Sequence, residues 1–433
     1  MLYYSTNKQV SPVSLREAVV KGLASDKGLF MPEVVKSLSQ DFYDHIENMS
    51  FQEMACQVAE AFFGEDISED ILRQIVYDTL SFDIPLVKVK ENIYSLELFH
   101  GPTLAFKDIG ARFMARLLGY FISEQGEKEV HVLVATSGDT GSAVANGFLG
   151  VNGIHVHVLY PKGKVSEIQE KQFTTLGQNI TALEIDGTFD DCQALVKAAF
   201  TDKELNEHLA LTSANSINVA RFLPQAFYYF YVYAQLKKMG RPNRAVISVP
   251  SGNLGNLTAG LFGKRMGLPV IRFIAANNVN NIFHRYLQTG KYDVRPSVAT
   301  IANAMDVGNP SNFARILDLY HYSHAAVSAD ISGASYNDEQ IRETVKNVYR
   351  ETKYLLDPHG ACAYRALEEL LQSGQTGIFF ETAHPAKFLE TVETIIGSKI
   401  EIPAKLQKFM KGEKNSLSLP KEFAVFKQYM LTL

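Results

Sequence analysis

Cysteines and long apolar runs are both scarce in this sequence of 433 residues. The three cysteines, Cys56, Cys192 and Cys362, are far apart and odd in number. Such usage is typical of a reducing compartment, so we expect a cytoplasmic protein whose cysteines are small core residues. No stretch of about 18 apolar residues occurs, so the sequence predicts no membrane span. The N-terminus, MLYYSTNKQV, also lacks the basic-then-apolar pattern of a signal peptide.

An excess of one charge is missing as well. The formal net charge is -5 and no run of lysines and arginines occurs, so electrostatics give no reason to expect nucleic acid as a partner. We also expect no metal, because His155 and His157 fall on a predicted strand and His321 and His324 stand apart from acidic ligands. Apolar residues make up 46% of the chain, which predicts a globular protein with a large core and two or three domains.

The first 85 residues have a mostly helical pattern. Ser14 is placed to cap a helix over LREAVVKGLA, and two more helical patterns run through FQEMACQVAEAFF and EDILRQIVYDTL. No strand pattern alternates with these helices. We therefore expect residues 1–85 to form a separate N-terminal domain.

After Pro85 the pattern changes to strands that alternate with helices. Apolar strands are predicted over residues 93–99, 130–135, 154–161, 180–186, 244–250, 270–277 and 377–383. This alternation predicts an α/β core with mostly parallel sheets flanked by helices. In such folds ligands bind beyond the carboxyl ends of the strands, so the polar loops there are candidate site loops. The charged and irregular tail from about Lys399 onward predicts surface elements.

One of these loops is SVPSGNLGNLTAG, residues 248–260. Gly252, Asn253, Gly255 and Asn256 lie between a predicted strand and a predicted helix. Glycines allow successive backbone N–H groups to turn toward one point, and the helix N-terminus adds partial positive charge, which suits a phosphate. The spacing matches neither a Walker A loop nor the dinucleotide-binding glycine pattern. The alternative is an ordinary turn built of glycine and asparagine.

A second loop, ATSGDTGSAVA, brings hydroxyl groups and backbone N–H groups together. Ser137, Asp139 and Thr140 lie between a strand and a helix, where they are suited to bind a carboxylate or phosphate. The alternative is that Asp139 or Thr140 only caps the helix.

A third loop, LTSANSINVARF, is crowded with polar groups at the start of a helix. Arg221 can bind a phosphate with two parallel hydrogen bonds. The alternative is helix capping by Ser216 or Asn218 together with a surface arginine.

Lys107 follows a predicted strand and a Gly-Pro turn in HGPTLAFKDIGARF. Schiff-base chemistry needs the neutral amine, and burial beside apolar groups such as Phe106 lowers a lysine pKa from about 10.4. A buried lysine together with a phosphate loop points to pyridoxal phosphate. The alternative is a surface lysine paired with Asp108.

Five motifs occur in the order HGPTLAFKD, ATSGDTGSA, NSINVAR, SGNLGN and ETAHPAKF. With these motifs, and with the N-terminal stretch SPVSLREAVVKGLASDKGLFMPE, the chain resembles the threonine synthases, which have the tryptophan-synthase-β-like (type II) pyridoxal phosphate fold. The resemblance covers essentially the whole chain. It implies a pyridoxal phosphate-binding core of two α/β lobes over residues 86–433, behind the helical N-terminal domain.

The resemblance also implies roles for single residues. Lys107 matches the Schiff-base lysine, and Thr382 matches the hydroxyl that meets the pyridine nitrogen, where a carboxylate would instead keep the nitrogen protonated. Strand alternation is expected to turn the adjacent Glu381 to the opposite face. Asp139 is matched to the cofactor-binding set but departs from the wider fold, where an asparagine commonly stands beside the cofactor's ring oxygen and an acid could repel a phenolate. The remaining matches are the loop that holds the cofactor phosphate, Gly252, Asn253, Leu254, Gly255 and Asn256, and positions that bind the substrate carboxylate or phosphate, Ser137, Thr140, Ser216, Asn218 and Arg221.

The implied reaction converts O-phospho-L-homoserine and water into L-threonine and phosphate, by γ-elimination of phosphate and β-addition of water through a Schiff base on Lys107. Two alternatives stay open. One is a serine/threonine dehydratase or β-replacement enzyme of the same fold, which should lack the Arg221 cluster and the N-terminal segment. The other is a cofactor-binding paralogue without turnover. A monomer and a homodimer are both compatible with the sequence.

Overall fold

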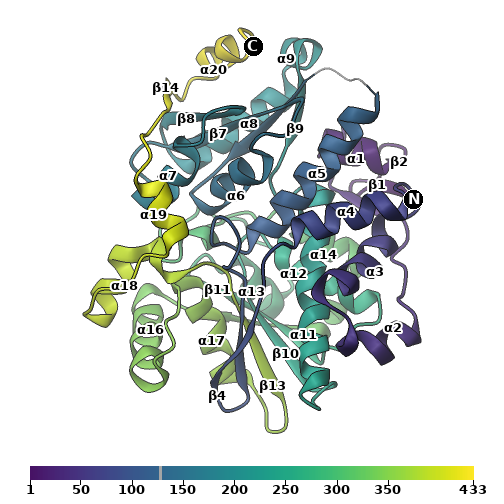
Figure 1. The fold of residues 1–433 in the computed structure, drawn as a ribbon, viewed down its shortest axis with the longest axis vertical. Coiled ribbons are helices and arrows are strands. Elements are labelled where there is room, and N and C mark those ends of the chain that lie inside the picture. The colour runs from purple at the N-terminus through teal and green to yellow at the C-terminus, as the bar shows by residue number, and fades with distance from the viewer. Residues whose placement is uncertain (126–128) are drawn as a thin grey trace.

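The computed structural model describes residues 1–125 and 129–433. Its strands form three sheets, and helices pack around them (Figure 1). The strands are β1 (Leu2–Ser5), β2 (Val13–Ser14), β3 (Phe30–Pro32), β4 (Leu86–Lys90), β5 (Ile93–Glu97), β6 (Val130–Ala135), β7 (Ile154–Pro161), β8 (Ile180–Asp186), β9 (Ala210–Ser213), β10 (Ala245–Pro250), β11 (Arg272–Asn277), β12 (Ile331–Ser335), β13 (Thr376–Glu381) and β14 (Leu417–Pro420).

Helices cover both large sheets. The α-helices are α1 (Leu15–Lys21), α2 (Gln40–His45), α3 (Phe51–Phe63), α4 (Glu69–Thr79), α5 (Lys107–Gln125), α6 (Asp139–Phe148), α7 (Glu167–Thr174), α8 (Phe189–Thr201), α9 (Lys203–His208), α10 (Val219–Phe222), α11 (Ala226–Lys238), α12 (Gly255–Arg265), α13 (Ile282–Thr289), α14 (Phe313–Leu319), α15 (His324–Asp330), α16 (Asp338–Thr352), α17 (Pro358–Leu370), α18 (Leu389–Ile396), α19 (Ala404–Met410) and α20 (Phe423–Met430). Short 3-10 helices are η1 (Ile46–Asn48), η2 (Leu223–Gln225), η3 (Asn303–Met305) and η4 (Pro385–Phe388).

The N-terminal segment contains the helices that the sequence predicts. The Ser14 hydroxyl caps α1 by accepting from the Glu17 N–H, and Ser50 and Glu53 form a capping box at the start of α3. A small antiparallel sheet in the order β2-β1-β3 was not expected, because strands of two to four residues are too short to show alternation. The segment's apolar side chains share one core with α5 and α11, so a domain boundary at residue 85 stays a prediction.

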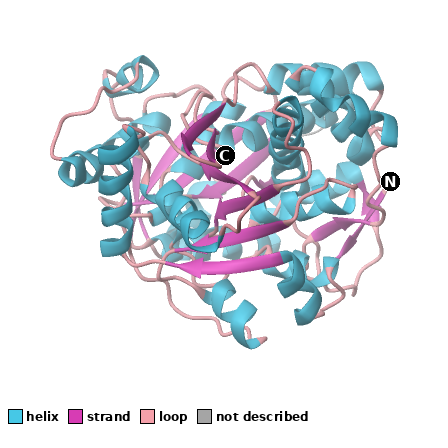
Figure 2. Cartoon of the chain, turned by 90° about the horizontal axis from the view of Figure 1, so that it is seen from below, coloured by secondary structure: helices cyan, strands magenta, loops and turns pink. Residues whose placement is uncertain are grey.

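The first large sheet has six strands in the order β12-β11-β10-β13-β5-β4. All neighbouring pairs are parallel except β4 and β5. Helix α17 packs against β10, β11 and β13. The predicted strands at 93–99, 244–250, 270–277 and 377–383 are confirmed here with small shifts of their ends. The strands lie between layers of helices, as Figure 2 shows.

The second large sheet has five parallel strands in the order β14-β8-β7-β6-β9. The tail, predicted to be irregular surface elements, in part joins this sheet. Strand β14 extends the edge of this sheet beside β8, and α20 buries Phe426 and Met430 against α8. In Figure 1 the yellow tail runs past α7 to that edge. Across the part of the chain that the structure describes, no helix is long and apolar enough to span a membrane.

Candidate active site

Lys107 is the first residue of α5, and the chain just before it is tied to the end of β13. The Phe106 N–H donates to the Thr382 carbonyl over 2.9 Å, and Ala105 forms an isolated antiparallel bridge with Ala383. Two motifs that are far apart in the sequence therefore lie side by side. The arrangement brings the chain segments of Lys107 and Thr382 together, while the roles of both residues toward a cofactor stay predictions.

The environment of Lys107 favours a reactive amine. Its side chain is partly accessible, yet the surrounding protein lowers the Lys107 pKa to about 8, mainly by desolvation. The positive charges of Arg221 and Lys387 act in the same direction, and the carboxylate of Asp139 acts against them. A pKa of about 8 leaves a usable fraction of neutral amine near neutral pH.

Asp108 does not support the alternative of a surface lysine pair. It is buried, and its carboxylate accepts from the Thr103 N–H over 2.9 Å and from the Thr103 hydroxyl over 2.5 Å. These bonds close the turn before α5. Asp108 therefore shapes the turn that presents Lys107.

The loop after β10 is closely packed. Leu254 has a left-handed φ of 62° directly before α12. A Cβ atom on Gly252 would lie 2.8 Å from the Ala304 carbonyl oxygen, so a glycine is required there. The Asn256 amide fixes the loop by donating to the Pro250 carbonyl over 2.9 Å. Backbone N–H groups thus gather at the N-terminus of an 11-residue helix, which is a suitable place for a phosphate.

Ser216 lies against this same loop. Its hydroxyl accepts from the Asn253 side-chain amide over 2.7 Å, and Asn253 Oδ1 accepts from the Ser311 N–H over 2.6 Å. The structure therefore joins Ser216 to the predicted phosphate loop, while a contact of Ser216 with the substrate stays a prediction.

Asn218 has a structural role. It is fully buried, it caps α10 by accepting from the Ala220 N–H over 3.0 Å, and its amide donates to the Val19 carbonyl over 2.8 Å. The capping alternative for this residue is confirmed. Both polar atoms of the Asn218 side chain already have hydrogen-bond partners, and substrate binding by Asn218 stays a prediction.

Arg221 is buried rather than on the surface, with 2% of its area exposed. Its Nε and Nη1 atoms have no hydrogen-bond partner among the described residues. It packs against the first turn of α5, where a Cβ atom on Gly110 would lie 3.5 Å from Arg221 Nε. Burial lowers the Arg221 pKa to about 10, which still leaves a cation at neutral pH. An uncompensated buried guanidinium is costly unless an anion joins it.

The loop before α6 is not capped by an acid. The N-cap is Gly138, whose φ of 141° places it outside the ordinary range of L-residues, and no side chain makes the cap. The Thr136 hydroxyl instead accepts from the N–H groups of Gly138 and Gly141, over 2.9 and 2.8 Å. Ser137 and Thr140 are partly accessible, and their contact with substrate stays a prediction.

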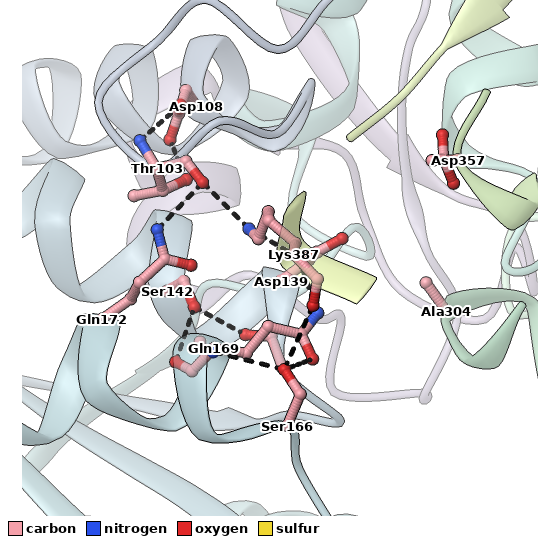
Figure 3. A network of polar contacts seen from close by, with 12 residues as sticks. Thr103, Asp108, Asp139, Ser142, Ser166, Gln169, Gln172, Ala304, Asp357 and Lys387 are labelled. Carbon is pink, nitrogen blue, oxygen red and sulfur yellow. Dashed lines mark hydrogen bonds and ion pairs between the residues drawn. The ribbon is translucent and has the colours of Figure 1, made fainter. Parts of the chain in front are cut away.

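Asp139 is held by an ion pair that the sequence reasoning missed. Its Oδ1 atom lies 2.6 Å from Lys387 Nζ and accepts from the Gln169 amide over 2.9 Å (Figure 3). Burial alone would raise the Asp139 pKa, but the positive charges of Lys387 and Lys107, with hydrogen bonds from Lys387 and Gln169, together hold it well below its usual range. The signal was present in the motif ETAHPAKF, which ends at this lysine and the next residue, Phe388.

Glu381 interacts with the start of α17. Its Oε1 accepts from the Asp357 N–H over 2.5 Å, and burial beside the Asp357 carboxylate raises the pKa of Glu381. A buried acid of raised pKa therefore lies next to Thr382 in the chain, while Thr382 itself is 6% exposed. A contact of Thr382 with the pyridine nitrogen stays a prediction.

Comparison with known proteins agrees with this geometry. The family described as "Pyridoxal-phosphate dependent enzyme" matches residues 80–377, and "Threonine synthase N terminus" and "Threonine synthase, C-terminal" match residues 2–80 and 360–430. The chain is 44% identical over 433 residues to the threonine synthase of Serratia marcescens, with 100% of each chain covered. The chain belongs to the threonine synthase family.

Solved structures of threonine synthases share the fold. The Escherichia coli threonine synthase matches with a TM-score of 0.93 and 43% identity, over 100% of both chains. A pyridoxal phosphate-bound threonine synthase from Brucella melitensis matches with a TM-score of 0.92 and 34% identity, over 100% of this chain and 99% of that one. The chain is thus a pyridoxal phosphate-dependent lyase with the type II fold.

The residues of the site fit pyridoxal phosphate. Lys107 is a lysine of lowered pKa, the loop around Gly252 and Leu254 is shaped for an anion, and both lie at the carboxyl side of the six-stranded sheet. Within residues 1–125 and 129–433, no group of three His, Cys, Asp or Glu side chains is arranged to hold a metal ion.

Proposed function

We propose that this chain converts O-phospho-L-homoserine and water into L-threonine and phosphate, with Lys107 as the residue that binds the cofactor covalently. The observation that carries the proposal is Arg221, a buried cation beside α5 with two nitrogen atoms that find no hydrogen-bond partner in the described part of the chain. Arginine binds phosphate with short, charge-assisted and often paired hydrogen bonds. A substrate phosphate next to Lys107 supplies the anion that this guanidinium lacks.

Each residue has a defined task in this proposal. The loop from Gly252 to Asn256 holds the cofactor phosphate, and Thr382 faces the ring nitrogen with a neutral hydroxyl. The cofactor, when bound, withdraws electrons from the substrate Cα atom. Lys107, once displaced by the substrate amine, takes the proton from Cα and moves protons at Cβ as general base and acid. A pKa of about 8 suits both duties.

As the Cγ–O bond breaks, negative charge increases on the departing phosphate. Arg221 and the N–H groups of the loop from Ser137 to Ser142 stabilise that charge, with the hydroxyls of Ser137 and Thr140 close by in the sequence. A proton is then delivered to Cγ, water adds at Cβ, a proton returns to Cα, and Lys107 displaces the threonine product. Ser216 and Asn218 complete the predicted substrate-binding set.

The dehydratase and paralogue alternatives are weaker. A serine or threonine substrate has no phosphate to neutralise Arg221, and a paralogue without turnover has no need of a lysine whose pKa is lowered to about 8. The monomer or homodimer and the cytoplasmic location stay predictions from the sequence.

The test is the substrate preference of Arg221→Ala. We expect kcat/KM for O-phospho-L-homoserine to fall by about one to two powers of ten, while residual action on unphosphorylated L-serine hardly changes. Arg315→Met is a matched control. Arg315 is also buried, but it already donates to the carbonyls of Phe30 and Ser216, so its loss should lower stability without changing substrate preference. Equal losses on both substrates in Arg221→Ala would contradict the phosphate role.

A further inference from the structure

The ion pair between Asp139 and Lys387 is the least expected feature near Lys107. Lys387 has no exposed area, and the Asp139 side chain is only 4% exposed. Lys387 Nζ also donates to the Thr103 carbonyl over 2.9 Å, four residues before Lys107. Two opposite charges are therefore buried together against the turn that presents the reactive lysine.

Four separate elements build this pair. Asp139 begins α6, Lys387 lies on η4, Gln169 comes from α7, and Thr103 belongs to the turn before α5. The Ser166 hydroxyl, which caps α7, contacts Gln169 Oε1 at 3.0 Å and the Lys387 carbonyl at 3.3 Å (Figure 3). Since Gln169 and Lys387 both contact Asp139, the network fixes the carboxylate from two sides. Such a network is more than a chance surface contact.

Without Lys387, the Asp139 carboxylate beside Lys107 would lose its ion-pair partner. Asp139 is the negative group that acts on Lys107, and Arg221 and Lys387 are the positive groups. Lys387 itself also faces Asp108 and His384 electrostatically. If Lys387 were absent, the buried Asp139 carboxylate would need another cation, and the Lys107 ammonium is the nearby group able to supply it.

We propose that Lys387 is a positioning residue for the reaction: by pairing with Asp139, it prevents that carboxylate from binding the Lys107 ammonium and so keeps the Lys107 amine free to react. Asp139 and Lys387 act as a neutral unit beside the cofactor ring. The carboxylate stays ionised without presenting an unpaired negative charge to the ring oxygen. This inference rests on the proposed role of Lys107 in covalent cofactor binding.

The experiment follows the capture of pyridoxal phosphate by the apoprotein. Stopped-flow absorbance gives the rate of capture between about pH 6 and pH 11, and its midpoint reports the amine of Lys107. We expect the unmodified chain to show a midpoint of about 8. In Lys387→Met the midpoint should rise towards the ordinary lysine value of about 10.4, and capture at pH 8 should be roughly a hundredfold slower.

Two further variants separate charge from structure. Asp139→Asn removes the negative charge, so its midpoint should fall below that of the unmodified chain. The double variant Asp139→Asn/Lys387→Met removes both charges and should return the midpoint to about that of the unmodified chain. A purely structural role of Lys387 predicts no opposite shifts and no such recovery.

Lys405→Met is the matched control. Lys405 donates to the His100 carbonyl over 2.7 Å near the same turn but is exposed, so its loss should leave the midpoint unchanged. Unchanged midpoints, or shifts of Lys387→Met and Asp139→Asn in the same direction, would overturn the inference. If Lys387→Met does not fold, the Asp139→Asn midpoint still tests the inference, because it should fall below that of the unmodified chain. If borohydride reduction instead fixes the cofactor on a lysine other than Lys107, the proposed function itself is wrong.

Discussion

Phe106 and Thr382 are joined by a backbone hydrogen bond of 2.9 Å from the Phe106 N–H to the Thr382 carbonyl. This bond connects the turn before Lys107 to the end of β13. The proposed covalent attachment point and the predicted partner of the ring nitrogen are therefore held near each other by the backbone, independently of side-chain rotamers. The site is built where the carboxyl ends of parallel strands meet.

Replacing Thr382 by valine should weaken cofactor binding without disturbing the fold. Valine keeps the shape and removes the hydroxyl, and the loss of one hydrogen bond of about 1 kcal/mol corresponds to roughly a fivefold higher Kd for pyridoxal phosphate. Fluorescence titration of the apoprotein measures this Kd. Thr376→Val is the control, because Thr376 is buried at the opposite end of the same strand. An unchanged Kd in Thr382→Val would remove Thr382 from the site.

Replacing Gly138 by alanine should be destabilising by about 1–3 kcal/mol. Gly138 has a φ of 141°, and a Cβ atom there would lie 2.5 Å from the Gln169 side chain, which holds Asp139. Urea unfolding measures the change. Gly177→Ala is the control for backbone strain alone, since Gly177 has a φ of 62° and open space around it. Equal losses in the two variants would mean that contact with Gln169 adds nothing.

Much of this site could be predicted from short-range patterns. Strand ends and glycine loops indicated the regions of Lys107 and Gly252, because these signals are contained in a few neighbouring residues, whereas the role of Thr382 followed only from the family resemblance. The ion pair of Asp139 and Lys387 could not be predicted in this way, because its partners come from distant motifs that only the fold brings together.

The fold shows the same division between short-range and long-range signals. The longer strands of the parallel sheets are mostly apolar runs that can be recognised in the sequence. Strand β14 has little burial of its own and forms by adding to the edge at β8. Because the tail is polar and its packing partners lie elsewhere in the chain, its strand and helix could not be predicted from the local sequence.

Acid should destabilise the protein partly through His157. Burial, with the nearby His131 and His155, lowers the His157 pKa to about 3. The folded state therefore keeps His157 neutral while the unfolded state takes up a proton below about pH 6.5, so stability is lost as the pH falls through that value. At about pH 5 this effect reaches about 2 kcal/mol.

His157→Gln should reduce that loss. Urea unfolding at about pH 7.5 and pH 5 measures the difference in stability between the two conditions, which should be smaller in the variant than in the unmodified chain. His45→Gln, at an exposed position, should leave the difference unchanged. The same pH dependence in all three proteins would contradict the role of His157.

The most direct test of the whole account is to locate the covalently bound cofactor. Borohydride reduction of the holoenzyme, followed by proteolysis and mass spectrometry of the peptides, identifies the modified lysine. The account predicts the pyridoxyl label on Lys107, in the peptide that contains HGPTLAFKD, and no label at that position in Lys107→Ala. A label on Lys387 or on any other lysine of the unmodified chain would contradict it.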